Sequence, residues 1–91
     1  MTEITFVRSQ SREADLRTGL KKSARAARMR DGLLTSTVAV SKRARAFLGH
    51  ELDAVAAAVA RGADDEEIRA VVRELEANRK NLSLGFWRGK P

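Results

Sequence analysis

The sequence predicts a small, mainly α-helical domain built around an antiparallel helical hairpin, and three observations lead to this prediction. Apolar residues recur at helical spacing over about 41–61 and again over about 65–78. Gly62 lies between the two patterns and supplies a stop for the first of these helices. A chain of 91 residues is long enough for one domain only. We therefore treat 1–91 as a single domain whose helical body covers 11–78.

The chain is short and has no covalent crosslinks, which predicts a dimer. A domain of this length buries only about 60% of the surface that its unfolded chain exposes. It has no Cys and one His, so it can form neither a disulfide nor a structural zinc site. A second copy of the chain is the natural source of further buried surface, and we expect no metal and no cofactor.

The N-terminal third predicts a basic helix that follows a strand-like or flexible start. Residues 1–10 have the β-branched and aromatic content of a short strand, although a flexible terminus fits them equally well. Ser9 or Ser11 then caps a helix that runs to about Arg30, because a serine hydroxyl accepts a hydrogen bond from an otherwise unpaired amide. The weakly apolar face of this helix consists of Leu16, Leu20, Ser23 and Ala27.

Residues 33–40 (LLTSTVAV) alternate in the manner of a strand, but nothing separates them from the helix that follows. A short strand over 33–40 is therefore one interpretation, and a helix that begins near Thr35 is the other. In the first interpretation Ser41 caps the second helix, which extends to Arg61. The predicted buried face of that helix consists of Ala44, Phe47, Leu48, Leu52, Val55 and Val59.

The third helix has the strongest local signals in the chain. Asp64 and Glu67 have the spacing of a capping box, and acids at 64–67 complement the positive end of the helix dipole. The apolar stripe that follows predicts a core face made of Ile68, Val71, Val72 and Leu75.

The net charge of +6 is unevenly distributed along the chain. Residues 51–78 hold eight acids against three bases, whereas the rest of the chain is basic. Segregated positive charge is typical of proteins that bind a polyanion, although a solvated helical surface is the alternative. On a continuous first helix, four of the cations would form one stripe. The predicted phosphate-binding residues are Arg17, Lys21, Arg25, Arg28, Lys42, Arg43 and Arg45.

Residues 79–91 form a basic tail that carries apolar and aromatic side chains. Such side chains need a docking site, either within the protein or its dimer, on a partner protein, or against nucleic acid. The candidate partner-binding residues are Leu82, Leu84, Phe86 and Trp87.

The order strand, helix, Gly-containing turn, helix over 35–78, with TSTVAVSKRARAFL before RGADDEEIRAVVRELEA, resembles the ribbon-helix-helix regulators. This family includes Arc-like repressors and ParD-like antitoxins, which are intertwined dimers. The resemblance implies that Thr35, Thr37 and Ala39 face the bases of the DNA major groove. The sequence departs from the family pattern at 64–67, where four acids replace a phosphate-binding helix start.

No catalytic constellation is recognisable, because His50 stands alone and the six glycines are scattered. We therefore expect a non-enzymatic DNA-binding regulator or accessory protein that acts as a dimer through a basic face. The alternative is a protein-binding module, such as an inhibitor, antitoxin or antiactivator. The chain shows no signal peptide and no apolar run of transmembrane length, and its composition suits a bacterial, cytoplasmic protein.

Overall fold

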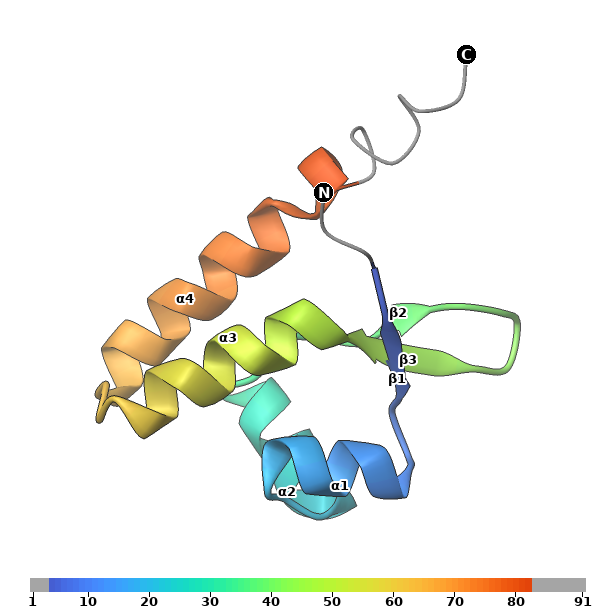
Figure 1. Cartoon of the computed structure of the whole chain (residues 1–91), viewed down its shortest axis with the longest axis horizontal. Helices are drawn as coiled ribbons and strands as arrows, with labels where there is room; N and C mark the ends of the chain where they lie inside the picture. Colours follow the sequence, from blue (N-terminus) through green and yellow to red (C-terminus); the bar gives the residue numbers. More distant parts are fainter. Residues whose placement is uncertain (1–3, 83–91) are drawn as a thin grey trace.

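The structure, a computed structural model, describes residues 4–82 and confirms a mainly α-helical fold. In Figure 1, α3 runs between the α1–α2 pair on one side and α4 on the other, and a small sheet lies at its N-terminal end. None of the helices in the described part combines the length and apolar content needed to cross a bilayer. In chain order the elements are β1 (Phe6–Arg8), α1 (Arg12–Thr18), α2 (Lys22–Arg30), β2 (Val38–Ala39), β3 (Arg45–Leu48), α3 (Gly49–Ala60) and α4 (Asp65–Ala77).

The sheet is antiparallel, and β3 is its central strand between β1 and β2. Val7 of β1 lies opposite Phe47, and both side chains are buried. Ala39 of β2 lies opposite Arg45, and the loop 40–44 closes the β2–β3 hairpin. The strand over 6–8 agrees with one of the two interpretations of the N-terminus, whereas the predicted strand over 33–40 is wrong in extent. Leu33, Leu34 and Thr35 are buried as a connecting segment instead.

The antiparallel hairpin of α3 and α4 is confirmed, but α3 begins at Gly49 rather than near Ser41. Ser41 lies in the loop of the β2–β3 hairpin. Ala46, Phe47 and Leu48 belong to a central strand that is covered on both faces, and a short run of this kind cannot be distinguished from a helix by its apolar pattern. Val59 is 50% exposed, so the predicted face is also wrong there, and Ala58 is buried in its place.

The start of α4 matches its prediction. The Asp64 carboxylate accepts a hydrogen bond from the amide of Glu67 at 2.9 Å, and the Glu67 side chain accepts one from the amide of Asp64 at 3.1 Å. Gly62 has a φ of 84°, which favours glycine at the end of α3. Ile68 and Val72 enter the core with Leu52 and Val55, while Val71 and Leu75 pack at its edge.

The single first helix predicted over 11–30 is wrong, because Gly19 divides it into α1 and α2. Gly19 has a φ of 73° and its amide donates to the carbonyl of Asp15 at 2.8 Å, which ends α1. Ser11 does cap α1, since its hydroxyl accepts from the amide of Ala14 at 3.1 Å. Leu16 is 71% exposed and therefore does not lie on a buried face.

Arg79 belongs to the folded body and not to a separate tail. Its guanidinium donates to both carboxylate oxygens of Glu51, at 2.8 and 2.6 Å, and to the carbonyl of Ser36 at 2.7 Å. Leu82 is half-buried at the end of the described chain, while the other predicted partner-binding residues, Leu84, Phe86 and Trp87, lie outside the described residues.

Candidate nucleic-acid interface

The helices α1 and α2 are joined by a three-residue turn, 19–21, that contains Gly19, and a short turn containing glycine is one feature of helix-turn-helix units. A buried arginine holds this unit together. Arg25 is 2% exposed, and its guanidinium bonds to Asp15, to the carbonyl of Leu20 at 2.6 Å and to the carbonyl of Ser9 at 2.8 Å. One side chain of α2 thus fixes its position against α1, the turn and the segment after β1.

The outer side of α2 is basic and carries small side chains. Its exposed residues include Lys22, Ser23, Ala26 and Arg30, and the helix contains no acid. No side chain caps its first turn, because the N-cap residue Lys21 makes no such hydrogen bond. Small residues allow another surface to approach closely, and uncapped amides at a helix start favour an anion.

The basic outer side of α2 continues to the β2–β3 hairpin, and we call this combined region the basic surface. One hollow of about 760 Å³ lies between the starts of α1 and α2, and a second of about 380 Å³ lies between β1 and β3. Gln10 lines both hollows, so they adjoin. The cations around them are Arg8, Arg12, Lys21, Lys22, Arg25, Arg43 and Arg45.

The hairpin loop extends this surface beyond the body of the protein. In Figure 1 the β2–β3 hairpin projects away from the helices. Lys42 and Arg43 are exposed in its loop. The Arg45 side chain is held in place, because it donates to the Thr37 hydroxyl and to the Thr37 carbonyl, both at 2.8 Å. Within residues 4–82 the hairpin therefore presents two cations without an ion pair and one that is oriented.

Negative charge is concentrated elsewhere. The acidic first turn of α4 follows the α3–α4 turn, which lies at the opposite end of the molecule from the hairpin loop in Figure 1. Among the residues described, Asp15 is the only acid that lines the two hollows, and it is paired with Arg25 and Lys21. The basic surface therefore keeps most of its positive charge.

The structure separates the seven predicted phosphate-binding residues into two groups. Lys21, Lys42, Arg43 and Arg45 lie along the basic surface. The predicted single stripe is wrong, because Gly19 breaks the helix and the other three cations have different surroundings. Arg25 is buried as described, and Arg28 lines an apolar cavity on another side of α2. Arg17 is the third of these cations.

Arg17 bonds to acids on two helices. Its guanidinium donates to the Asp53 carboxylate at 2.8 Å and to the Glu13 carboxylate at 3.4 Å. The hydrogen bond to Asp53, the charge of that carboxylate and the contact with Glu13 raise the pKa of the Arg17 guanidinium, against a smaller opposing effect of burial. Arg17 therefore joins α1 to α3 rather than facing a phosphate.

The three residues that the resemblance placed against bases are also dispersed. Thr35 is fully buried, Thr37 supports Arg45, and Ala39 is exposed on β2. Sequence reasoning missed Arg8, Arg12 and Lys22 as members of the surface. The signal that would have found Lys22 is Gly19, since a glycine at the C-cap ends the first helix and lets a second helix begin after it.

The Asp15–Arg25 pair predicts a dependence of stability on pH. The hydrogen bond from Arg25 lowers the pKa of the Asp15 carboxyl, and the charges of Lys21 and Arg25 add to this effect, while partial burial opposes it. A carboxyl whose pKa is depressed by folding stabilises the fold at pH values above about 3.9, which is its pKa in the unfolded chain. This contribution is lost as the pH falls through the pKa of the folded state. Asp15→Asn should therefore destabilise the protein at pH 7, with a smaller difference from wild type near pH 3.

Urea unfolding midpoints at the two pH values measure this effect. Asp31→Asn is the matched control, because the exposed Asp31 carboxylate has no ion pair among residues 4–82. A difference between wild type and Asp15→Asn that stays constant from pH 7 to pH 3 would contradict the role assigned to the Asp15 charge.

No protein-family model, no curated protein and no solved structure matches the chain significantly. The resemblance to ribbon-helix-helix regulators therefore stays a prediction. Within residues 4–82 no group of three or more His, Asp or Glu side chains is arranged to hold a metal ion.

Proposed function

We propose that this protein is a non-enzymatic regulator or accessory protein that binds duplex DNA, with α2 in the major groove and the β2–β3 hairpin loop on the adjoining backbone. The observation that carries the proposal is the continuity of the basic surface: the outer side of α2 and the hairpin adjoin through Gln10. In helix-turn-helix proteins the second helix enters the major groove and the first helix crosses the backbone.

The residues divide by the kind of contact that each can make. Lys22 and Ser23 begin α2 and are exposed, which suits the base-edge contacts made at the start of such a helix. Arg8, Arg12 and Arg43 carry long cationic side chains beside them, which suits phosphate contacts. Base reading is thus assigned to α2 rather than to 35–39, because Thr35 is fully buried.

The dimer and the cytoplasmic location are part of this proposal. Phe6, Leu16 and Val59 are apolar side chains that are at least half exposed, and a second copy would remove such surface from water. A dimer would also place two α2 helices on successive turns of the duplex, about 34–36 Å apart. Sedimentation of the free protein and of its DNA complex gives the stoichiometry.

The direct test is a titration of wild-type protein against a mixed-sequence DNA duplex over a series of salt concentrations. Each phosphate contact contributes about −0.9 to the slope of log affinity against log salt. Arg12→Ala combined with Arg43→Ala should therefore flatten the slope by roughly 2 and weaken binding about 60-fold at 0.1 M salt, with one phosphate contact for each residue.

The control pair removes the same charge from the other end of the molecule. Arg61 and Arg73 are exposed on the α3–α4 side and have no ion pair among residues 4–82. Arg61→Ala combined with Arg73→Ala should leave the slope within about half a unit of wild type. If the two double variants changed the slope equally, binding would respond only to the net charge of the protein, and this result would contradict the assigned surface. A wild-type protein without affinity for duplex DNA at low salt would favour the protein-binding alternative.

A further inference from the structure

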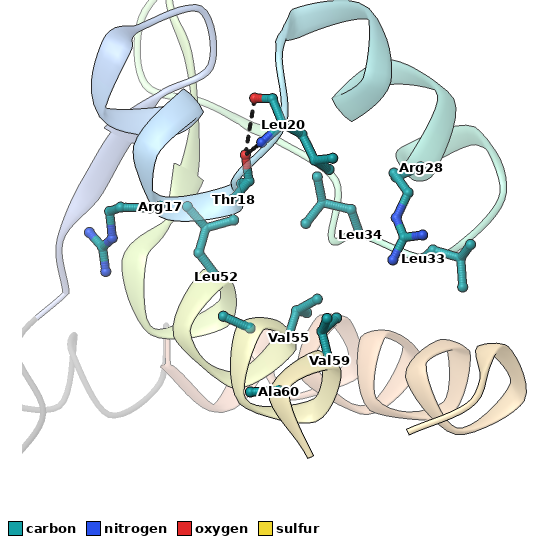
Figure 2. Close-up of a pocket in the computed structure, with 11 residues that line it drawn as sticks. Arg17, Thr18, Leu20, Arg28, Leu33, Leu34, Leu52, Val55, Val59 and Ala60 are labelled. Carbon is teal, nitrogen blue, oxygen red and sulfur yellow. Dashed lines mark hydrogen bonds between the residues drawn. The ribbon is translucent and has the colours of Figure 1, made fainter. Parts of the chain in front are cut away.

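Another hollow, distinct from the basic surface, lies where α1 and α2 meet α3. Its volume is about 190 Å³. Figure 2 shows Leu20 and Leu34 on one side of it and Leu52, Val55 and Val59 on the other. The remaining lining residues are Arg17, Thr18, Arg28, Leu33, Ala56 and Ala60. The interior is thus aliphatic, and cations occur only at its margin.

The two arginines at the margin differ in their surroundings. Arg17 is bonded to Asp53 and Glu13, and in Figure 2 its guanidinium is directed away from the cavity. Arg28 has no hydrogen bond or ion pair from its side chain within residues 4–82, and its guanidinium lies beside Leu33. A partly buried guanidinium next to aliphatic side chains gains most from a planar anion that accepts two hydrogen bonds.

We infer that this cavity is a binding site for a small apolar carboxylate, whose carboxylate bonds to Arg28 and whose hydrocarbon part fills the space among Leu20, Leu34 and Val55. A cavity of about 150 Å³ lined by aliphatic residues accommodates benzene, so the volume suits a ligand of benzoate size. The mixture of an apolar interior with one convergent charged group is typical of small-molecule sites. The inference goes beyond DNA binding and does not depend on it.

Benzoate is the probe, and the free protein without DNA is the sample. Backbone amide chemical shifts of ¹⁵N-labelled protein should change with benzoate at Leu20, Leu34 and Val55. Benzyl alcohol has the same ring without the charge, and it should bind more weakly. Arg28→Gln should weaken benzoate binding roughly tenfold or more, because it removes a charge-assisted hydrogen bond, while it leaves benzyl alcohol binding nearly unchanged.

Two further variants keep the test decisive. Arg28→Lys retains the charge without the fork-shaped donor, so it should bind benzoate with an intermediate affinity. Arg30→Gln is the control on the same helix, since Arg30 is exposed and does not line the cavity, and it should bind like wild type.

Several results would overturn the inference. One is the absence of shift changes at these residues at millimolar benzoate. Another is an affinity for benzyl alcohol equal to that for benzoate, which would show a cavity selective for hydrocarbon alone. A third is amide chemical shifts that change with protein concentration but not with benzoate concentration, which would show that a second copy of the chain covers the site. DNA affinity is measured separately, so loss of either activity leaves the other to be judged independently.

Discussion

Arg79→Ala is expected to destabilise the fold by about 3–5 kcal/mol, the range observed when one partner of a buried ion pair is removed. Glu51 is fully buried at the start of α3, and the Arg79 guanidinium donates to both of its carboxylate oxygens. That hydrogen-bonded contact raises the pKa of the Arg79 guanidinium. Without Arg79 the carboxylate would stay buried with no compensating charge. Because small domains have only about 5–15 kcal/mol of stability, this single change should unfold a large fraction of the molecules.

Denaturant unfolding monitored by circular dichroism measures this loss, and two variants make it specific. Glu66→Ala also breaks an ion pair, with Arg69 at 2.9 Å, but the Glu66 side chain is exposed and Arg69 keeps its hydrogen bond to the carbonyl of Asp31, so the change should be about 1 kcal/mol or less. Glu51→Met combined with Arg79→Met replaces both charges with apolar side chains and should recover most of the stability. A double variant no more stable than Arg79→Ala alone would contradict this explanation.

Phe47→Ala is expected to cost about 3–5 kcal/mol, because it leaves a cavity at the centre of the sheet. Phe47 is fully buried on β3, which pairs with both other strands, and it lies opposite Val7. Loss of its packing weakens the contact between β1 and β3, on which the hollow lined by Arg8 and Arg43 depends.

The melting temperature measures the effect on the sheet, and an exposed position on the same hairpin is the control. Val40 is 41% exposed, so Val40→Ala should change stability by about 0.5 kcal/mol or less. Equal losses from the two substitutions would show that the core does not centre on β3.

The elements predicted well from the sequence are those fixed by local interactions. Asp64 and Glu67 lie three residues apart, and their mutual capping depends on almost nothing outside α4. The sheet was not predicted, because the partner of Phe47 is Val7, far away in sequence, and pairing over such a distance leaves no local pattern. Gly19 lies inside the single helix that the sequence predicts over 11–30, whereas its left-handed conformation ends α1.

The sequence predicted that the candidate site is basic, but it identified only some of the residues that form it. The excess of acids over 51–78 and of bases over the rest of the chain follows directly from the sequence. Which cations are exposed depends on the division between α1 and α2. Arg25 and Lys22 are three residues apart on the same helix, yet Arg25 is buried as a structural link and Lys22 is exposed beside the hollow at the start of α2. Only the tertiary packing of α2 distinguishes them.

The pairing of β1 with β3 also bears on when the hollow between these two strands forms during folding. α3 and α4 are neighbours in the chain and can pack after closing a short turn, whereas β1 and β3 join positions about 40 residues apart. The entropy lost in closing a loop grows with its length, so local contacts form at a lower entropic barrier than distant ones. A partly folded chain that contains only the α3–α4 hairpin has neither hollow assembled. We therefore expect the hollow between β1 and β3 to form later than the local α3–α4 contacts, and a nascent chain to acquire it only after β3 has paired with β1.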